Sequence, residues 1–70
     1  MYHVDISKLN GKIAEKATTK EQLAQQIGID RSTLIRRLKN GKLLVGDAHV
    51  ICESLELSTS EAVAIFLATQ

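Results

Sequence analysis

One glycine divides the most constrained part of this chain, the stretch 23–38 with the sequence LAQQIGIDRSTLIRRL, into two short helical patterns. Apolar residues recur every three or four positions on both sides of it: Leu23, Ala24, Ile27, Leu34 and Leu38. Gly28 stands where a left-handed residue ends a helix, and Asp30 is a favoured N-cap for the next helix. The stretch therefore predicts two helices that meet at a fixed corner, with Ile29 packed back into the core.

A first helix is expected to begin after Asp5, whose side chain can accept a hydrogen bond from a free backbone N–H group. Its buried face has the spacing of a helix stripe and comprises Ile6, Leu9, Ile13 and Ala17. Gly11 lies off this stripe. It either admits a close neighbour or marks an earlier end of the helix, and the pattern leaves both alternatives open.

The second helix has two candidate capping boxes at its start. Thr19 can accept a hydrogen bond from the first turn while Gln22 reaches back to the cap. Thr18 with Glu21 offers the same arrangement one residue earlier. Either register starts the helix shortly before its inner face.

The later helices carry start and stop signals of the same kind. The third helix is expected to run to about Lys39 and to stop at the Asn40–Gly41 pair, before a loop over 41–46. Asp47 is expected to cap a fourth helix, and Ser58–Glu61 is a capping box for the last one. The inward residues of the fourth helix are Val50, Ile51 and Leu55.

Residues 1–70 are expected to form a single all-α domain, because the chain has no proline, no repeat and no sustained polar–apolar alternation. Cys52 is the only cysteine, so no disulfide forms within the chain, and its apolar neighbours favour a buried or half-buried structural thiol. His3 and His49 have no further ligand at metal-binding spacing. The longest apolar run, 62–68, is too short to span a bilayer. We expect no cofactor, no small-molecule ligand, no membrane association and no enzyme activity.

Charge is divided unevenly along the chain. Residues 1–46 carry nine basic and four acidic side chains, a formal charge of +5, whereas residues 47–70 carry four acids and no Lys or Arg, a charge of −4. Lysines that merely solvate helix faces would explain any one of these charges. The complete segregation favours a surface in the first part that binds a polyanion.

The third helix carries the side chains that would reach such a partner. At 100° per residue, Leu34 and Leu38 mark its buried side. The side chains on or near the opposite side are Ser32, Thr33, Arg36 and Lys39. The flanks carry Arg31, Ile35 and Arg37. Arginine can donate two hydrogen bonds to guanine O6 and N7, and serine accepts or donates at any base. We therefore expect this side of the helix to bind in a DNA major groove and not merely to be solvated.

The motifs Thr19–Ala24, Ile27–Ile29, Arg31–Leu34 and Asn40–Lys42 together resemble the Cro and phage-repressor family of lambda-repressor-like helix-turn-helix domains. The resemblance covers about residues 5–67. It implies a compact five-helix fold in which the second and third helices form the helix-turn-helix.

The resemblance also implies which side chains contact DNA. The family's base-reading positions correspond to Arg31, Ser32, Ile35 and Arg36. Its phosphate contacts correspond to Lys20 and to the loop residues Asn40, Gly41 and Lys42. The other polar side chains of the third helix are expected to contact phosphates too: Thr33, Arg37 and Lys39.

Three residues depart from the family pattern. Lys20 stands where the family often has Gln, which keeps a phosphate partner and steepens the salt dependence. Ala17 stands where Gly often ends the first helix, so a left-handed cap there would be strained. Arg37 occupies a usually apolar position, which leaves open whether Ile35 or Arg36 faces the groove.

The last helix is apolar nearly all round, so it either completes the core or pairs with another chain. In the family the fifth helix often pairs two domains, and we expect Ile65 and Phe66 at a homodimer interface. The resemblance therefore implies a phage or prophage repressor or Cro-like protein that binds operator DNA in the bacterial cytoplasm, on the nucleoid. The alternative is a protein-interaction module on the same scaffold, such as an antirepressor or an antitoxin-like partner protein.

Overall fold

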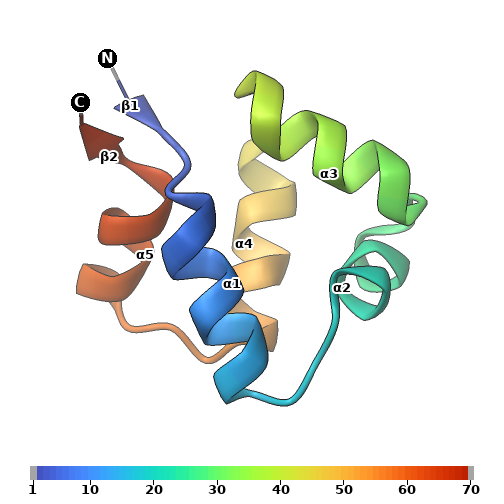
Figure 1. The fold of residues 1–70 in the computed structure, drawn as a ribbon, viewed down its shortest axis with the longest axis horizontal. Coiled ribbons are helices and arrows are strands. Elements are labelled where there is room, and N and C mark those ends of the chain that lie inside the picture. Colours follow the sequence, from blue (N-terminus) through green and yellow to red (C-terminus); the bar gives the residue numbers. More distant parts are fainter. Residues whose placement is uncertain (1, 70) are drawn as a thin grey trace.

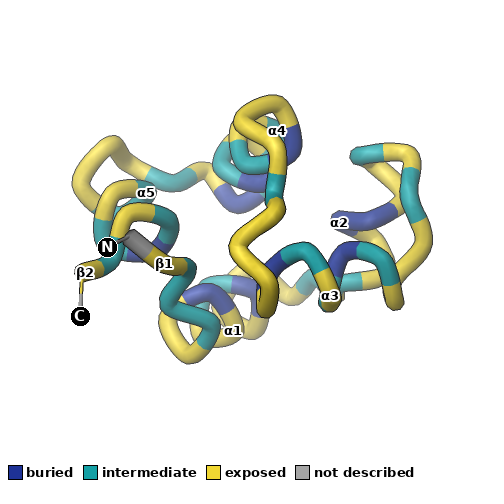
Figure 2. Tube along the Cα trace, turned by 90° about the horizontal axis from the view of Figure 1, so that it is seen from above, coloured by how far each residue is buried: buried dark blue, intermediate teal, exposed yellow. Residues whose placement is uncertain are grey.

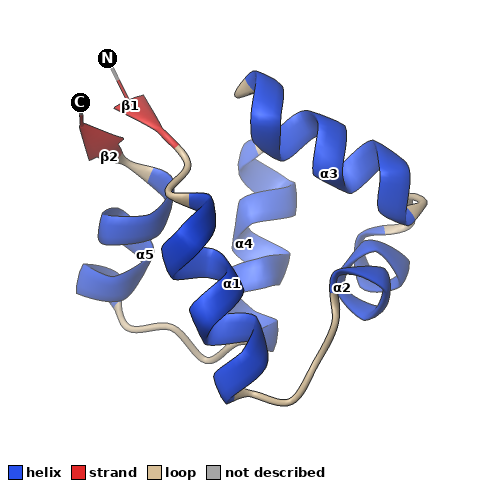
Figure 3. Cartoon of the chain, in the orientation of Figure 1, coloured by secondary structure: helices blue, strands red, loops and turns tan. Residues whose placement is uncertain are grey.

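Five helices form most of the chain, which the structure, a computed structural model, describes for residues 2–69 (Figures 1 and 3). A two-residue strand lies at either end. In chain order the elements are β1 (Tyr2–His3), α1 (Ile6–Glu15), α2 (Lys20–Ile27), α3 (Arg31–Asn40), α4 (Val45–Ser54), α5 (Thr59–Phe66) and β2 (Ala68–Thr69). The predicted all-α class with five helices is confirmed. Within the described range, no helix combines the length and the apolar character needed to cross a membrane.

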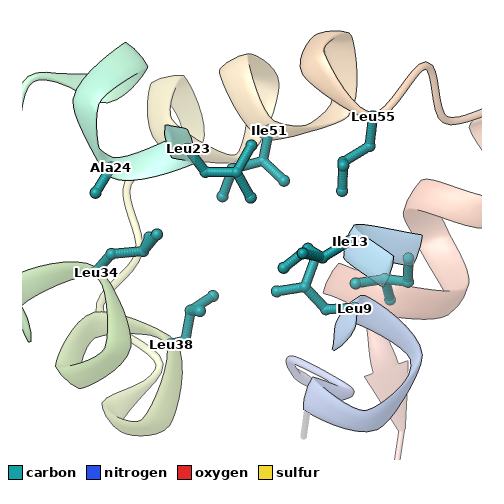
Figure 4. Packing of buried hydrophobic residues seen from close by; sticks show 9 residues of the cluster. Leu9, Ile13, Leu23, Ala24, Leu34, Leu38, Ile51 and Leu55 are labelled. Atoms are coloured by element: carbon teal, nitrogen blue, oxygen red, sulfur yellow. The ribbon is translucent and has the colours of Figure 1, made fainter. Parts of the chain in front are cut away.

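The core lies where the helices converge, with side chains from each of them pointing toward the centre (Figure 4). α2 packs on α3 and α4, and α1 packs on α5. Full burial of a leucine or isoleucine contributes about 1.5–3 kcal/mol relative to exposure, so a domain of this size depends on nearly all of them. The core side chains are Leu9, Ile13, Leu23, Ala24, Leu34, Leu38, Ile51, Leu55 and Ile65.

α1 begins where the sequence predicts but ends before the last residue of its predicted buried face. Asp5 caps it as expected, accepting a hydrogen bond from the backbone N–H of Lys8 at 3.1 Å. The helix ends at Glu15, and Ala17, predicted on the buried face, is exposed beyond that end with a left-handed φ of +53°. Gly11 is exposed in the middle of α1 with nothing within 4 Å of where a Cβ would lie. Gly11 therefore admits no close neighbour, and α1 is shorter than its predicted stripe, although it does not end at Gly11.

The corner between α2 and α3 is formed by three residues, Gly28 to Asp30. Gly28 has the expected left-handed backbone, with a φ of +94°, and its N–H donates to the carbonyl of Ala24 at 2.9 Å. Ile29 is half-buried and packs against the core. The predicted break and the predicted return of the chain into the core are both confirmed.

Two details at these helix starts differ from expectation. Thr19 accepts the backbone N–H of Gln22 at 3.1 Å, but the Gln22 side chain accepts the hydroxyl of Thr18 instead of reaching the cap. Asp30 occupies the N-cap position of α3, yet its carboxylate accepts the hydroxyl of Thr33 and no backbone N–H. At both helix starts, the side chain predicted to accept a backbone N–H group accepts a nearby threonine hydroxyl instead.

The prediction that Asp47 caps the fourth helix is wrong. α4 begins two residues earlier, at Val45, with Leu44 as an N-cap that supplies no side-chain hydrogen bond. Asp47 lies in the first turn and is only 8% exposed. By contrast, the capping box that starts α5 is complete, because Ser58 and Glu61 each accept a backbone N–H of the other.

The strands join the two ends of the chain, which lie side by side (Figure 1). β1 and β2 are antiparallel, with His3 opposite Ala68. Next to them, the N–H of Asp5 donates to the carbonyl of Ile65 at 2.7 Å, which ties the start of α1 to α5. Strands of two residues are too short to show alternation, so the sequence did not predict them.

Candidate nucleic-acid interface

α3 lies at the outer edge of the molecule and packs mainly on α2 (Figure 1). Leu34 and Leu38 hold it there, since both are buried and point toward the core (Figure 4). Figure 2 shows the other side of α3 as largely exposed. The helix therefore presents one long face to solvent.

The exposure of individual side chains settles how α3 is rotated. Its exposed residues are Arg31, Ser32, Arg36, Lys39 and Asn40. Its half-buried residues are Thr33, Ile35 and Arg37. Ser32 and Arg36 lie one turn apart on the outward face, whereas Ile35 is on a flank. Of the two side chains whose facing the sequence left open, Arg36 is thus the outward one.

Arg37 lies in an intramolecular ion pair. Its Nη1 donates to Oδ2 of Asp47 at 3.0 Å, and the two side chains are 30% and 12% exposed. Arg37 was predicted to contact a phosphate, but its guanidinium already has an anionic partner from the same chain. We therefore take Arg37 out of the candidate interface and treat it as a residue that joins α3 to α4.

Thr33 is similarly engaged at the start of α3, where its hydroxyl donates to Asp30. This hydrogen bond, together with the nearby charge of Arg36, holds the pKa of Asp30 below its ordinary value of 3.8. Asp30 is therefore ionised at neutral pH beside the outward face. Because its hydroxyl hydrogen is donated to Asp30, Thr33 has only acceptor lone pairs left for its predicted contact with a phosphate.

The division of charge along the sequence serves partly to join the two parts of the chain. Three ion pairs link a basic residue of the first part to an acid of the second: Lys12 to Glu61, Lys16 to Glu56 at 3.7 Å, and Arg37 to Asp47. Three of the nine cations are thus neutralised internally. The segregation of charge therefore does not indicate a surface for a polyanion by itself, because part of it pairs the two parts of the chain.

The remaining cations are concentrated on one part of the fold. Within residues 2–69, no ion pair involves Lys8, Lys20, Arg31, Arg36, Lys39 or Lys42. All but Lys8 belong to α2, α3 or the loop that follows α3. This basic surface, Lys20, Arg31, Arg36, Lys39 and Lys42, together with Ser32 and Asn40, contains most of the polar contacts that the sequence predicted.

α5 contributes to the core more than expected. Ile65, predicted at a dimer interface, is only 2% exposed and belongs to the core, so it cannot contact a second chain. Phe66 is half-buried and packs against the same core. The outward apolar residues are instead Val63 and Leu67, which are 47% and 49% exposed and line a shallow hollow between α4 and α5.

The sequence predicted the role of Cys52 but not that of Asp47. Cys52 is half-buried, and burial raises the pKa of its thiol, as suits the structural role predicted for it. The role of Asp47 as the partner of Arg37 was missed. A signal for it existed, because a cation at a usually apolar position needs an anion nearby.

Comparison of this chain with family models, with curated proteins and with solved structures found no match. The resemblance to lambda-repressor-like domains therefore depends on the residues themselves.

Proposed function

We propose that this protein is a sequence-specific, double-stranded DNA-binding transcriptional regulator of the lambda-repressor-like kind, with α2 and α3 as its helix-turn-helix. The observation that carries the proposal is the basic surface on α2, α3 and the following loop. Its cations form no ion pair among residues 2–69, whereas Lys12, Lys16 and Arg37 each pair with an acid. Unpaired cations on one exposed side are the electrostatic footprint of a nucleic-acid partner.

In the proposed complex α3 lies in the major groove. Its ten residues span about 15 Å, and the outward Ser32 and Arg36 can reach base edges together. Arg36 would donate two hydrogen bonds to a guanine, and Arg31 has the same capability at the start of the helix. Ile35, on the flank, can make an apolar contact with a thymine methyl group.

Phosphate contacts would fix the position of α3 in the groove. Lys20 begins α2, and its N-terminal position adds the positive end of the helix dipole to its own charge. Lys39, Asn40 and Lys42 are exposed at and after the end of α3. Contacts at both ends of the helix-turn-helix would set its orientation without reading sequence.

A homodimer would let two copies of α3 read a near-palindromic operator, with half-sites about 34 Å apart. The protein would then act as a repressor or Cro-like protein of phage or prophage type, by occupying its operator in the bacterial cytoplasm. The apolar residues Val63 and Leu67, with part of Phe66, are the surface we assign to the partner copy. Their exposure supports this choice over the buried Ile65.

Selection of bound sequences from a random duplex pool tests the proposal, followed by titration of the selected duplex with variants. Arg36→Ala should weaken the selected duplex by ~1–3 kcal/mol and relax preference at one base pair. Lys42→Ala should weaken all duplexes alike and lower the salt slope by about one unit. Lys8→Ala removes an equal charge from an exposed position of α1 and should leave the sequence preference unchanged.

The alternative, a protein-interaction module on the same scaffold, predicts a different result. Such a protein would select no duplex, or would bind DNA equally well after Arg31, Ser32 and Arg36 are all replaced by Ala. Either result would reject the DNA-binding proposal.

A further inference from the structure

The ion pair between Arg37 and Asp47 is the only side-chain hydrogen bond that joins α3 to another helix within the described residues. From this contact we infer that Arg37 and Asp47 are positioning residues, which set the rotation of α3 about its axis and thereby the base edges that Ser32 and Arg36 reach. The inference rests on the proposed function, because it concerns how the DNA-facing side of α3 is presented.

Apolar packing alone specifies the rotation of α3 weakly. The helix has ten residues and only two buried ones, Leu34 and Leu38, whose contacts have no fixed direction. With a helix diameter of about 10–12 Å, a rotation of about 20° would move a side-chain end by roughly 2 Å. Hydrogen bonds to base edges do not survive such a displacement. A directional contact on the flank of α3 is therefore needed to hold Arg36 in place.

The ion pair has the geometry for this task. It lies on one flank of α3 and reaches the first turn of α4, where free backbone N–H groups favour a carboxylate. Leu44, the N-cap, supplies no side-chain acceptor there, and Asp47 is the acid in the first turn of α4. Charge-assisted hydrogen bonds of this kind are shorter and stronger than neutral ones.

Arg37 also holds the chain after α3 through its backbone. Its carbonyl accepts the N–H groups of Gly41 and of Lys42, the latter at 3.1 Å. The residue that fixes the rotation of α3 thus also fixes the turn carrying Asn40 and Lys42. One rigid unit then presents the predicted base contacts and the predicted phosphate contacts.

Burial prevents the pair from separating easily. Asp47 is 8% exposed as a residue, and an unpaired carboxylate at such a site loses most of its hydration. Any rotation of α3 that withdraws Arg37 leaves this charge without a partner. The cost of that separation is what keeps α3 at one angle.

The test compares Asp47→Asn with Glu53→Gln, which removes the same charge from an exposed site on α4. The measured quantity is the ratio of affinities for the selected duplex and for a random duplex, together with each variant's Tm. Asp47→Asn should lower this ratio about tenfold, because the hydrogen bonds from Arg36 to its base would no longer be aligned. Its affinity for random duplex should not fall, since removing an acid favours binding to a polyanion. Glu53→Gln should leave the ratio unchanged.

Arg37→Lys, which keeps the cation without the planar guanidinium, should give a ratio between those of wild type and Asp47→Asn. A folded Asp47→Asn whose ratio stays within about twofold of wild type would overturn the inference. So would failure of both Asp47→Asn and Arg37→Lys to fold, because the pair would then maintain the fold as a whole.

A measurement without DNA separates this inference from the proposed function. Residual dipolar couplings report the direction of α3 amides relative to α1, and they should change in Asp47→Asn but not in Glu53→Gln. If the wild-type chain selects no duplex, the proposed function is wrong, and so is the base-reading role of Ser32 and Arg36. If the wild type binds DNA but the couplings of Asp47→Asn match those of wild type, the positioning role alone fails.

Discussion

Ala17 and Glu56 have left-handed backbone, each with a φ of +53°, and both follow the end of a helix. In each case the next residue's N–H donates to a carbonyl five residues back, from Thr18 to Ile13 and from Leu57 to Cys52. This is the hydrogen bond that usually accompanies glycine at such a helix end. The strain expected of an alanine at position 17 is therefore present in the fold.

Replacing Ala17 by Gly should raise the free energy of unfolding by about 0.5–1 kcal/mol. The left-handed conformation costs an L-residue about 1–2 kcal/mol, and the greater conformational entropy of glycine in the unfolded state offsets part of the gain. Urea unfolding monitored by circular dichroism measures the change. Ala14→Gly, at an exposed position in the last turn of α1, is the matched control and should lower stability by up to about 1 kcal/mol. Equal effects at the two positions would contradict the assigned backbone conformation.

The hydrogen bond from Lys12, together with those from Ser58, lowers the pKa of Glu61 from 4.5 to about 2. A group whose pKa is lowered by folding stabilises the fold above its unfolded pKa. That contribution is lost as the pH falls from 4.5 toward 2.

Glu61→Gln should therefore flatten the loss of thermal stability between pH 4.5 and pH 2. Measuring Tm against pH for the wild type and the variant shows the difference. Glu21→Gln, at an exposed position of α2, is the control and should follow the wild-type curve. A Glu61→Gln curve parallel to that of the wild type would contradict the low pKa.

Helix boundaries set by local signals were largely predicted from the sequence. The left-handed turn at Gly28, the cap at Asp5 and the capping box of α5 all depend on residues within about four positions of one another. Asp47 was assigned wrongly because an acid before a helical pattern has the same local signature whether it caps the helix or pairs with a distant arginine.

Two glycine-to-alanine substitutions should have opposite effects. Gly11→Ala should raise the free energy of unfolding by about 0.5–1 kcal/mol, because the site is an exposed helix interior with open space for a methyl group. Gly28→Ala should lower it by at least about 1 kcal/mol, because its φ of +94° is unfavourable for alanine. Chemical denaturation compares both. A stabilising Gly28→Ala would contradict the corner between α2 and α3.

The charges of the whole molecule combine two uses that the sequence alone does not separate. Lys12, Lys16 and Arg37 hold the helices of the first part against those of the second. The basic surface contains all the remaining cations except Lys8. Which lysine or arginine serves which purpose depends on what lies opposite it after folding.

The proposed dimer is best tested at Val63, which is exposed, whereas Phe66 packs against the core. Val63→Glu should weaken self-association at least about tenfold, because a charge would be buried at the interface, and should leave Tm nearly unchanged. Sedimentation equilibrium measures the association. Ser60→Glu, an exposed charge on the same helix, is the control and should leave association unchanged. A dimer unaffected by Val63→Glu would place the interface elsewhere.

Helix number, helix order and the corner at Gly28 follow from the amino-acid sequence, because capping, periodicity and left-handed turns act over a few neighbouring residues. The pairing of Arg37 with Asp47, the burial of Ile65 and the joining of β1 to β2 do not. These contacts arise only when the helices pack, and an apolar stripe is compatible with several packing arrangements. Directional contacts between distant residues select one of them, and with it the side of α3 that faces outward.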